Sequence, residues 1–193
     1  MEPTLTLEYY DLKWFNSPIF YEGMVGIRTE GDGSCFFHAI SKAISNEYKN
    51  GVFDKYIFDR KKFIKDFREH LASHLPKYYY QLSRGQLPEL AKDLPELSLE
   101  NMQNELNSNL PVDNRYNEYI SEMLSIDLYI LDGKKQTVYK TGKDSDILYK
   151  NRESVVILYS NHHYELVGVI ENDTVTTIFE PTHPFIMLLR KYI

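Results

Sequence analysis

The one cysteine of this chain, Cys35, lies in the stretch EGDGSCFFHAIS, just after two glycines and at the start of a predicted helix. A thiol is a good nucleophile only after it loses its proton. The free N–H groups and partial positive charge of a helix N-terminus favour that anion and could also hold an oxyanion. Gly31 and Gly33 let the backbone turn sharply and approach a substrate. The position suits a nucleophile; the alternative is a small cysteine that only packs in the core.

A catalytic thiolate needs a nearby base, and the chain has six histidines. His70 and His74 are four residues apart on a predicted helix without a third ligand nearby, so we interpret them as a solvated face rather than a metal pair. His162 and His163 lie at the junction of two predicted strands. Alternate side chains of a strand share a face, so His163 points the same way as Glu165 and His162 is the weaker candidate. This imidazole beside a carboxylate is the base and orienting group that a Cys/His site needs, although a polar hairpin end is the alternative.

Two short motifs connect these residues to a known family. The stretch from Asp32 to Ala39, D-G-S-C-F-F-H-A, resembles the D-G-N-C-L-F-x-A signature of the ovarian-tumour (OTU) cysteine proteases. The stretch His163-Tyr164-Glu165 resembles the C-terminal motif of that family, a histidine followed by an aromatic residue. The motifs occur in the family's order, with the expected separation of well over a hundred residues.

The resemblance implies a deubiquitinase, which hydrolyses the isopeptide bond after the C-terminal glycine of ubiquitin and needs no cofactor or metal. It implies that Cys35 is the nucleophile, that His163 is the general base and then the acid, and that Asp32 shapes the loop and the oxyanion hole. Glu165 takes the place of the third member, which is usually Asp or Asn. Ser34 replaces the usual Asn of the first motif. If the longer Glu165 turned away, Asp32 or a backbone carbonyl would orient the imidazole instead.

The charge balance bears on the partner. The net charge of −6 leaves no basic excess for a nucleic acid, whereas acidic and aromatic side chains suit the arginine-bearing tail and the basic, apolar face of ubiquitin or polyubiquitin. We expect the Leu-rich segment 80–125 to receive ubiquitin; ordinary packing is the alternative. Two other functions stay open: a non-catalytic ubiquitin-binding module of the same fold, and a cysteine peptidase that acts on another ubiquitin-like modifier.

The hydrophobic periodicity predicts helices first and strands second. Residues 34–48 and 57–75 have helical spacing, and Pro76 is expected to end the second helix. Further elements are expected as short helices over 80–114, a helix over 115–124, strands over 126–131, 154–160, 163–170 and 174–179, a hairpin at Asp132-Gly133 and a last helix begun by Pro184. The fold class is therefore α+β. The resemblance makes it a papain-like OTU fold, with N-terminal helices packed on a C-terminal, mainly antiparallel sheet.

Length and composition set the remaining expectations. A chain of 193 residues that is 42% hydrophobic predicts a single domain over 1–193, with residues 1–23 as an N-terminal extension packed on it. A single cysteine indicates a reducing compartment, cytoplasmic or nuclear. There is no apolar run of about 18 residues and no secretory signal, so no membrane association is expected. We expect a monomer. The short, divergent chain resembles the viral branch of the family, which would place it in the host cytoplasm.

Overall fold

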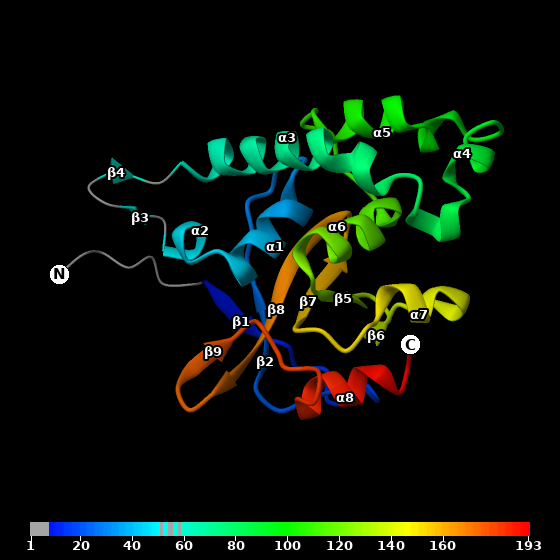
Figure 1. Cartoon of the computed structure of the whole chain (residues 1–193). Helices are drawn as coiled ribbons and strands as arrows, with labels where there is room; N and C mark the ends of the chain where they lie inside the picture. Colours follow the sequence, from blue (N-terminus) through cyan, green and yellow to red (C-terminus); the bar gives the residue numbers. More distant parts are fainter. Residues whose placement is uncertain (1–7, 51, 54–55, 58) are drawn as a thin grey trace.

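The computed structural model describes residues 8–50, 52–53, 56–57 and 59–193. Residues 1–7 of the expected extension and Phe58 of the expected helix lie outside this described part. A mixed sheet runs through the middle of the described chain, with the strand order β1-β2-β8-β7-β5-β6 and β9 paired to β8 (Figure 1). Its strands are β1 (Tyr9–Asp11), β2 (Met24–Ile27), β5 (Asp127–Asp132), β6 (Thr137–Val138), β7 (Ser154–Ser160), β8 (His163–Glu171) and β9 (Thr174–Thr176). A separate two-stranded sheet pairs β3 (Val52–Phe53) with β4 (Tyr56–Ile57).

Most of the helices lie on one side of the sheet (Figure 1). The α-helices are α1 (Cys35–Ile44), α2 (Asn46–Asn50), α3 (Arg60–Tyr78), α4 (Leu87–Leu90), α5 (Leu99–Leu106), α6 (Asn117–Leu124), α7 (Ser145–Leu148) and α8 (Pro184–Arg190). Short 3-10 turns are η1 (Leu82–Gly85), η2 (Pro95–Leu97), η3 (Asn114–Tyr116) and η4 (Gly142–Asp144). Strands β5 and β7 are parallel and the other pairs of the sheet are antiparallel. The α+β class and the mainly antiparallel sheet are confirmed.

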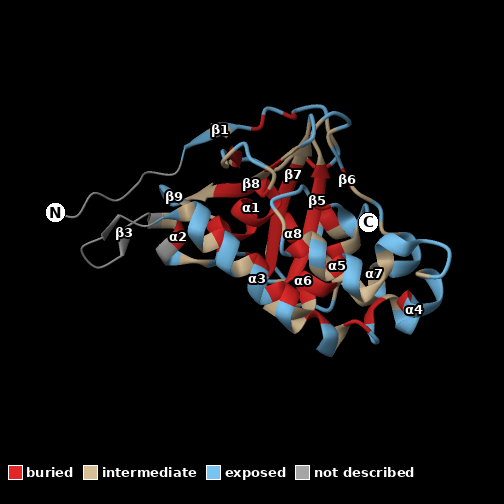
Figure 2. Ribbon diagram, turned by 90° about the horizontal axis from the view of Figure 1, so that it is seen from above, coloured by how far each residue is buried: buried red, intermediate tan, exposed pale blue. Residues whose placement is uncertain are grey.

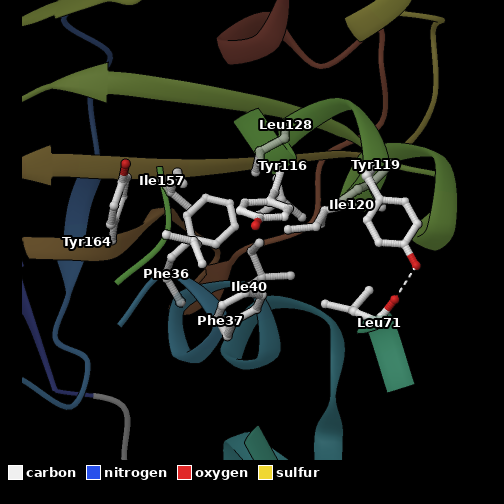
Figure 3. Packing of buried hydrophobic residues seen from close by; sticks show 14 of the residues in the cluster. Phe36, Phe37, Ile40, Leu71, Tyr116, Tyr119, Ile120, Leu128, Ile157 and Tyr164 are labelled. Carbon is white, nitrogen blue, oxygen red and sulfur yellow. Dashed lines mark hydrogen bonds between the residues drawn. The ribbon is translucent and has the colours of Figure 1, made fainter. Parts of the chain in front are cut away.

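Both faces of the sheet are covered by other parts of the chain. Successive side chains of a strand point to opposite faces, so the central strands contribute apolar side chains to both. On β7, Val155 and Ile157 pack into the cluster formed with α1, α3, α5 and α6, whereas Val156 and Leu158 pack into the cluster formed with α8 and the N-terminal segment. Figure 2 shows these strands buried between helices whose outer surfaces are exposed. In the first cluster, Phe36 and Phe37 of α1 contact each other edge to face (Figure 3).

The expected end of the second long helix is wrong. Helix α3 begins after the N-cap Asp59 and continues to Tyr78, so Pro76 lies inside its last turn. A proline has no N–H, and the carbonyl four residues earlier therefore loses its helical partner. In this structure the side-chain amide of Gln103 on α5 donates to that carbonyl, on Ala72, at 2.9 Å. A neighbouring helix thus satisfies the group that would otherwise end α3.

The end of the chain follows the prediction. Pro184 occupies the first turn of α8, and Nδ1 of the N-cap His183 accepts a hydrogen bond from the backbone N–H of Phe185 at 3.0 Å. The hairpin at Asp132-Gly133 also forms. Its turn runs over four residues, since the pair that closes it is Asp132 with Thr137. No helix in the described ranges is long and apolar enough to cross a membrane.

Candidate active site

Cys35 opens α1, and α1 packs against β8. The backbone N–H of Tyr164 on β8 donates to Cys35 Sγ at 3.4 Å, although the two residues are 129 positions apart in the chain. The ring of Phe36 meets the ring of Tyr164 edge to face at 5.1 Å between centroids (Figure 3). The fold therefore brings the two sequence motifs into direct contact.

The contact lies at an open edge of β8. Tyr164 uses its N–H for Cys35 Sγ and its carbonyl to accept the hydroxyl of Thr29 at 2.6 Å. The N–H and C=O of one strand residue point to the same side, so both partners lie at the same edge. Strand β2 pairs with this edge up to Ile27, opposite Leu166, and then ends. Cys35 and Thr29 thus take positions that a longer β2 would have occupied.

Asp32 shapes the loop before the cysteine. Its Oδ1 accepts the backbone N–H of Ser34 at 2.8 Å, and its Oδ2 lies 3.1 Å from Nε2 of His38. His38 is fully buried, and its Nδ1 hydrogen-bonds the hydroxyl of Tyr48. Burial lowers the pKa of His38, partly offset by the charge of Asp32. His38 is therefore a core residue that fixes the loop.

The segment after α5 closes over this loop. A Cβ added at Gly33 would lie 2.1 Å from the carbonyl oxygen of Asn109, so glycine is required there by the chain's own backbone. Nothing lies within 4 Å of a Cβ added at Gly31. The close approach that we expected toward a substrate is, at Gly33, an approach to Asn109.

Arg68 of α3 joins the cysteine loop to the segment after α5. It is 2% exposed, and its guanidinium donates to Ser34 Oγ at 2.8 Å and to the carbonyls of Leu106, Glu105 and Leu110 at 3.0, 2.8 and 2.9 Å. Its guanidinium also lies over the ring of Phe37. One buried cation therefore joins the residue before the cysteine to the segment that faces it.

The thiol differs from the expectation. Burial raises the pKa of Cys35, and the charge of Asp32 raises it further, whereas the N–H groups of Tyr164 and Phe36 lower it. Burial outweighs the helix start, because an anion is costly in an apolar setting. Cys35 therefore rests as a thiol, and its ionisation requires a base that accepts the proton.

The expected imidazole–carboxylate pair does not form. His163 Nε2 lies 3.3 Å from Thr29 Oγ1, whereas Glu165 Oε1 accepts the hydroxyl of Tyr10 at 2.6 Å. Within the described residues, no hydrogen bond or ion pair joins His163 to Glu165, and none joins His163 to Cys35 directly. His163 is nevertheless the residue before Tyr164, and its ring reaches the edge of β8 where the thiol lies.

A cleft of about 340 Å³ opens beside the thiol. Its lining consists of Asp32, Gly33, Cys35, Phe36, Glu105, Pro111, Val112, Asp113, Tyr159, His162 and Tyr164. His162, the weaker candidate base, thus lines the cleft, and its Nδ1 lies 3.3 Å from the hydroxyl of Tyr159. Asn161 and His162 both have positive φ and form the two-residue turn between β7 and β8, where His162 is exposed.

A larger hollow of about 520 Å³ lies farther along the same face, between η1, α6 and the η4–α7 segment. Residues 111–113 line the first cleft, and Asn114, Arg115 and Asn117 line the hollow. One stretch of chain, residues 111–117, therefore contributes to the lining of both.

The ranges that the structure describes contain no group of three or more His, Cys, Asp or Glu side chains arranged to hold a metal ion. His70 and His74 stack at 4.1 Å between ring centroids, and His74 Nδ1 bonds the carbonyl of His70.

Two residues at the site were not anticipated. Thr29 carried no sequence signal, because a threonine that follows a strand is common. Arg68 did carry one: it falls on the buried stripe of α3 marked by Ile64, Leu71 and Leu75. A charged side chain at such a position needs buried partners, which would have singled it out.

Comparison with known proteins supports the fold. No protein-family model matches the chain, and no curated protein gives a significant match. Among solved structures, it is similar to an OTU domain in complex with ubiquitin, with a TM-score of 0.58 and 15% identity over 88% of this chain and 81% of that one. It is also similar to the OTUD1 OTU domain (TM-score 0.49, 14% identity, 75% and 85% covered) and to the viral OTU domain protease from Dera Ghazi Khan virus (0.47, 16%, 77% and 82%). The chain has the fold of an OTU domain.

Proposed function

We propose that this protein is a thiol-dependent deubiquitinase, with Cys35 as nucleophile and His163 as general base and acid. The observation that supports it best is the hydrogen bond from the Tyr164 N–H to Cys35 Sγ, because Tyr164 directly follows the histidine of the second motif. The structural neighbour with a TM-score of 0.58 is an OTU domain bound to ubiquitin, which supports ubiquitin as the partner.

The proposed reaction begins with transfer of the Cys35 proton to His163. For this transfer the free ring nitrogen of the imidazole must come within hydrogen-bond reach of the thiol, and catalytic hydrogen bonds often tighten only when substrate binds. The sulfur then attacks the glycine carbonyl carbon, and the tetrahedral oxyanion collapses as His163 returns the proton to the leaving lysine amine. Water attacks the resulting thioester and gives one of its protons to His163. The tetrahedral intermediate then expels the sulfur, which takes that proton back from His163, and the released glycine carboxyl group loses its remaining proton to solvent.

Asp32 acts in this scheme through the backbone. It fixes the Ser34 N–H and, through His38, the start of α1. It does not contact His163 among the described residues, so its role is to hold the loop on which the thiol and the oxyanion donors lie.

The cleft and the hollow, which one stretch of chain helps to line, suit an extended tail. Glu105, Asp32 and Asp113 line the cleft, and Glu118 and Asp144 line the hollow, although Asp113 is already paired with Arg115. The acidic groups of the cleft complement the arginines of the ubiquitin tail, whereas the hollow also carries Arg84, Arg115 and Lys140. In this proposal the ubiquitin-receiving surface of segment 80–125 is its cleft side, beside η1 and α6.

Two observations favour a second function, a non-catalytic ubiquitin-binding module. Glu165 bonds Tyr10 rather than His163, and Cys35 rests as a thiol with a raised pKa. Such a module would bind ubiquitin through the same face and leave isopeptide bonds intact.

A ubiquitin probe with an electrophilic C-terminus tests the proposal. The wild type is expected to form a covalent adduct whose mass maps to Cys35, and Cys35→Ala is expected to form none. Calorimetric titration of Cys35→Ala with ubiquitin measures binding separately. Binding without adduct formation by the wild type would support the module and contradict the enzyme. Adducts only with probes built on other ubiquitin-like modifiers would change the substrate but keep the chemistry.

A further inference from the structure

The site contains a hydroxyl in the place where a Cys/His site needs an orienting group. Thr29 follows β2, is partly buried, and makes two contacts through its Oγ1. The hydroxyl donates to the carbonyl of Tyr164 at 2.6 Å and lies 3.3 Å from Nε2 of His163. We propose that Thr29 is the positioning residue that sets the orientation and tautomer of His163. This inference rests on the proposed function of the site.

The proton inventory gives the tautomer. A threonine hydroxyl has one proton, and a carbonyl oxygen can only accept, so that proton lies toward Tyr164. At its second contact Thr29 Oγ1 must then accept, and the proton is on Nε2 of His163. A neutral imidazole carries one N–H, so Nδ1 is left bare. A bare Nδ1 is the group that can take the proton of Cys35.

Glu165, the residue that the family pattern puts in this role, is held elsewhere. Its Oε1 accepts the hydroxyl of Tyr10 at 2.6 Å. The hydroxyl end of the Tyr10 ring lies against Gly26 of β2, since a Cβ added at Gly26 would be 2.5 Å from it, and the Arg28 guanidinium lies over the ring at 4.9 Å. Burial and the neighbouring Glu165 raise the pKa of Tyr10, so the phenol keeps the proton that it donates. Strand β1 thereby holds the carboxylate away from His163.

Thr29 also couples the two reacting groups. It anchors the carbonyl of Tyr164, the same residue whose N–H bonds Cys35 Sγ. Loss of the hydroxyl would release both the imidazole and the strand edge against which the sulfur lies. Threonine carries a methyl group and a hydroxyl on Cβ, and valine replaces that hydroxyl by a second methyl group. Thr29→Val therefore removes the polar contacts with little change of side-chain shape.

The first experiment needs no substrate and no variant of Thr29. Nitrogen-15 NMR of the wild-type protein, recorded at a pH where the imidazole is neutral, reports which ring nitrogen carries the proton. The His163 signals are assigned by their absence from the spectrum of His163→Gln. We expect the Nε2–H tautomer. A wild-type protein whose His163 is protonated on Nδ1 would overturn the inference.

The second experiment measures cleavage of a fluorogenic ubiquitin substrate by Thr29→Val, Thr29→Ser and Glu165→Gln. Thr29→Val should lower kcat by about ten- to a hundredfold, the rate equivalent of one hydrogen bond to the imidazole, with KM unchanged. Thr29→Ser should restore most of kcat, and Glu165→Gln should cost less than Thr29→Val. The inference fails if Thr29→Val keeps wild-type kcat or if Glu165→Gln costs more. A wild type that cleaves no ubiquitin substrate but shows the Nε2–H tautomer would refute the proposed function and leave the orientation by Thr29 standing.

Discussion

The buried Arg68 makes the strongest structural prediction. Its guanidinium bonds one hydroxyl and three backbone carbonyls, and Arg68→Met removes all of these while it keeps the apolar stem. A buried acceptor that loses its donor costs about 1–3 kcal/mol. The carbonyls of residues 105–110 lie near the surface and water can reach some of them, so the costs do not add in full. We expect a loss of about 3–5 kcal/mol, the usual cost of breaking a buried charged network.

That loss is large for a chain of this size. Single domains are stable by about 5–15 kcal/mol, and each kcal/mol shifts Tm by about 2–4 °C in chains of 150–250 residues. Arg68→Met should therefore lower Tm by roughly 10 °C or more. The Tm of Arg68→Lys should lie between those of the wild type and Arg68→Met, because an ammonium cannot reproduce the planar guanidinium that reaches several carbonyls at once.

Thermal unfolding followed by circular dichroism measures the effect. Lys62→Met is the matched control on the same helix, since Lys62 is 71% exposed and makes only a surface pair with Asp66. It should leave Tm unchanged. Hydrogen exchange adds a local readout: amides of residues 105–112 should exchange faster in Arg68→Met. If Arg68→Met unfolds at the temperature of Lys62→Met, the role assigned to this network is wrong.

Two further predictions concern the cysteine loop. Gly33→Ala should lose both thermal stability and probe labelling, because its Cβ meets a backbone carbonyl at 2.1 Å, whereas Gly31→Ala should keep both; equal behaviour of the two variants in a melting and labelling assay would contradict this. Asp32→Asn should shift the pH profile of Cys35 alkylation by iodoacetamide toward lower pH. The carboxylate raises the pKa of the thiol, so its neutral replacement increases the thiolate fraction at a given pH. An unchanged or upward-shifted profile would show that Asp32 does not influence the thiol.

The sequence predicts well where a local pattern decides the structure. The nearly all-apolar strand over 154–160 and the helix begun by Pro184 depend on nearby residues, and both form as expected. The helix end predicted at Pro76 is wrong, because Gln103 of another helix donates to the Ala72 carbonyl that the proline leaves without a partner. No local pattern carries that information.

The site divides in the same way. The motifs place Cys35 at the start of a helix and His163 at the start of a strand, and the structure brings these two ends together. The orienting contact could not be predicted, because Glu165 is taken by Tyr10 of a distant strand and Thr29 enters through the end of β2. The thiol's raised pKa was also out of reach, since burial depends on the whole packing.

The neighbouring histidines allow the most direct test of the central claim. The His163 imidazole lies beside Thr29, at the edge of β8 where Tyr164 bonds Cys35 Sγ. His162 lines the cleft from the turn between β7 and β8. The measurement is kcat for di-ubiquitin cleavage by wild type, His163→Ala and His162→Ala. We expect the wild type to cleave, His163→Ala to lose kcat about a thousandfold or more, and His162→Ala to stay within about tenfold of the wild type. Full activity in His163→Ala, or a loss of activity only in His162→Ala, would show that His163 is not the base that serves Cys35.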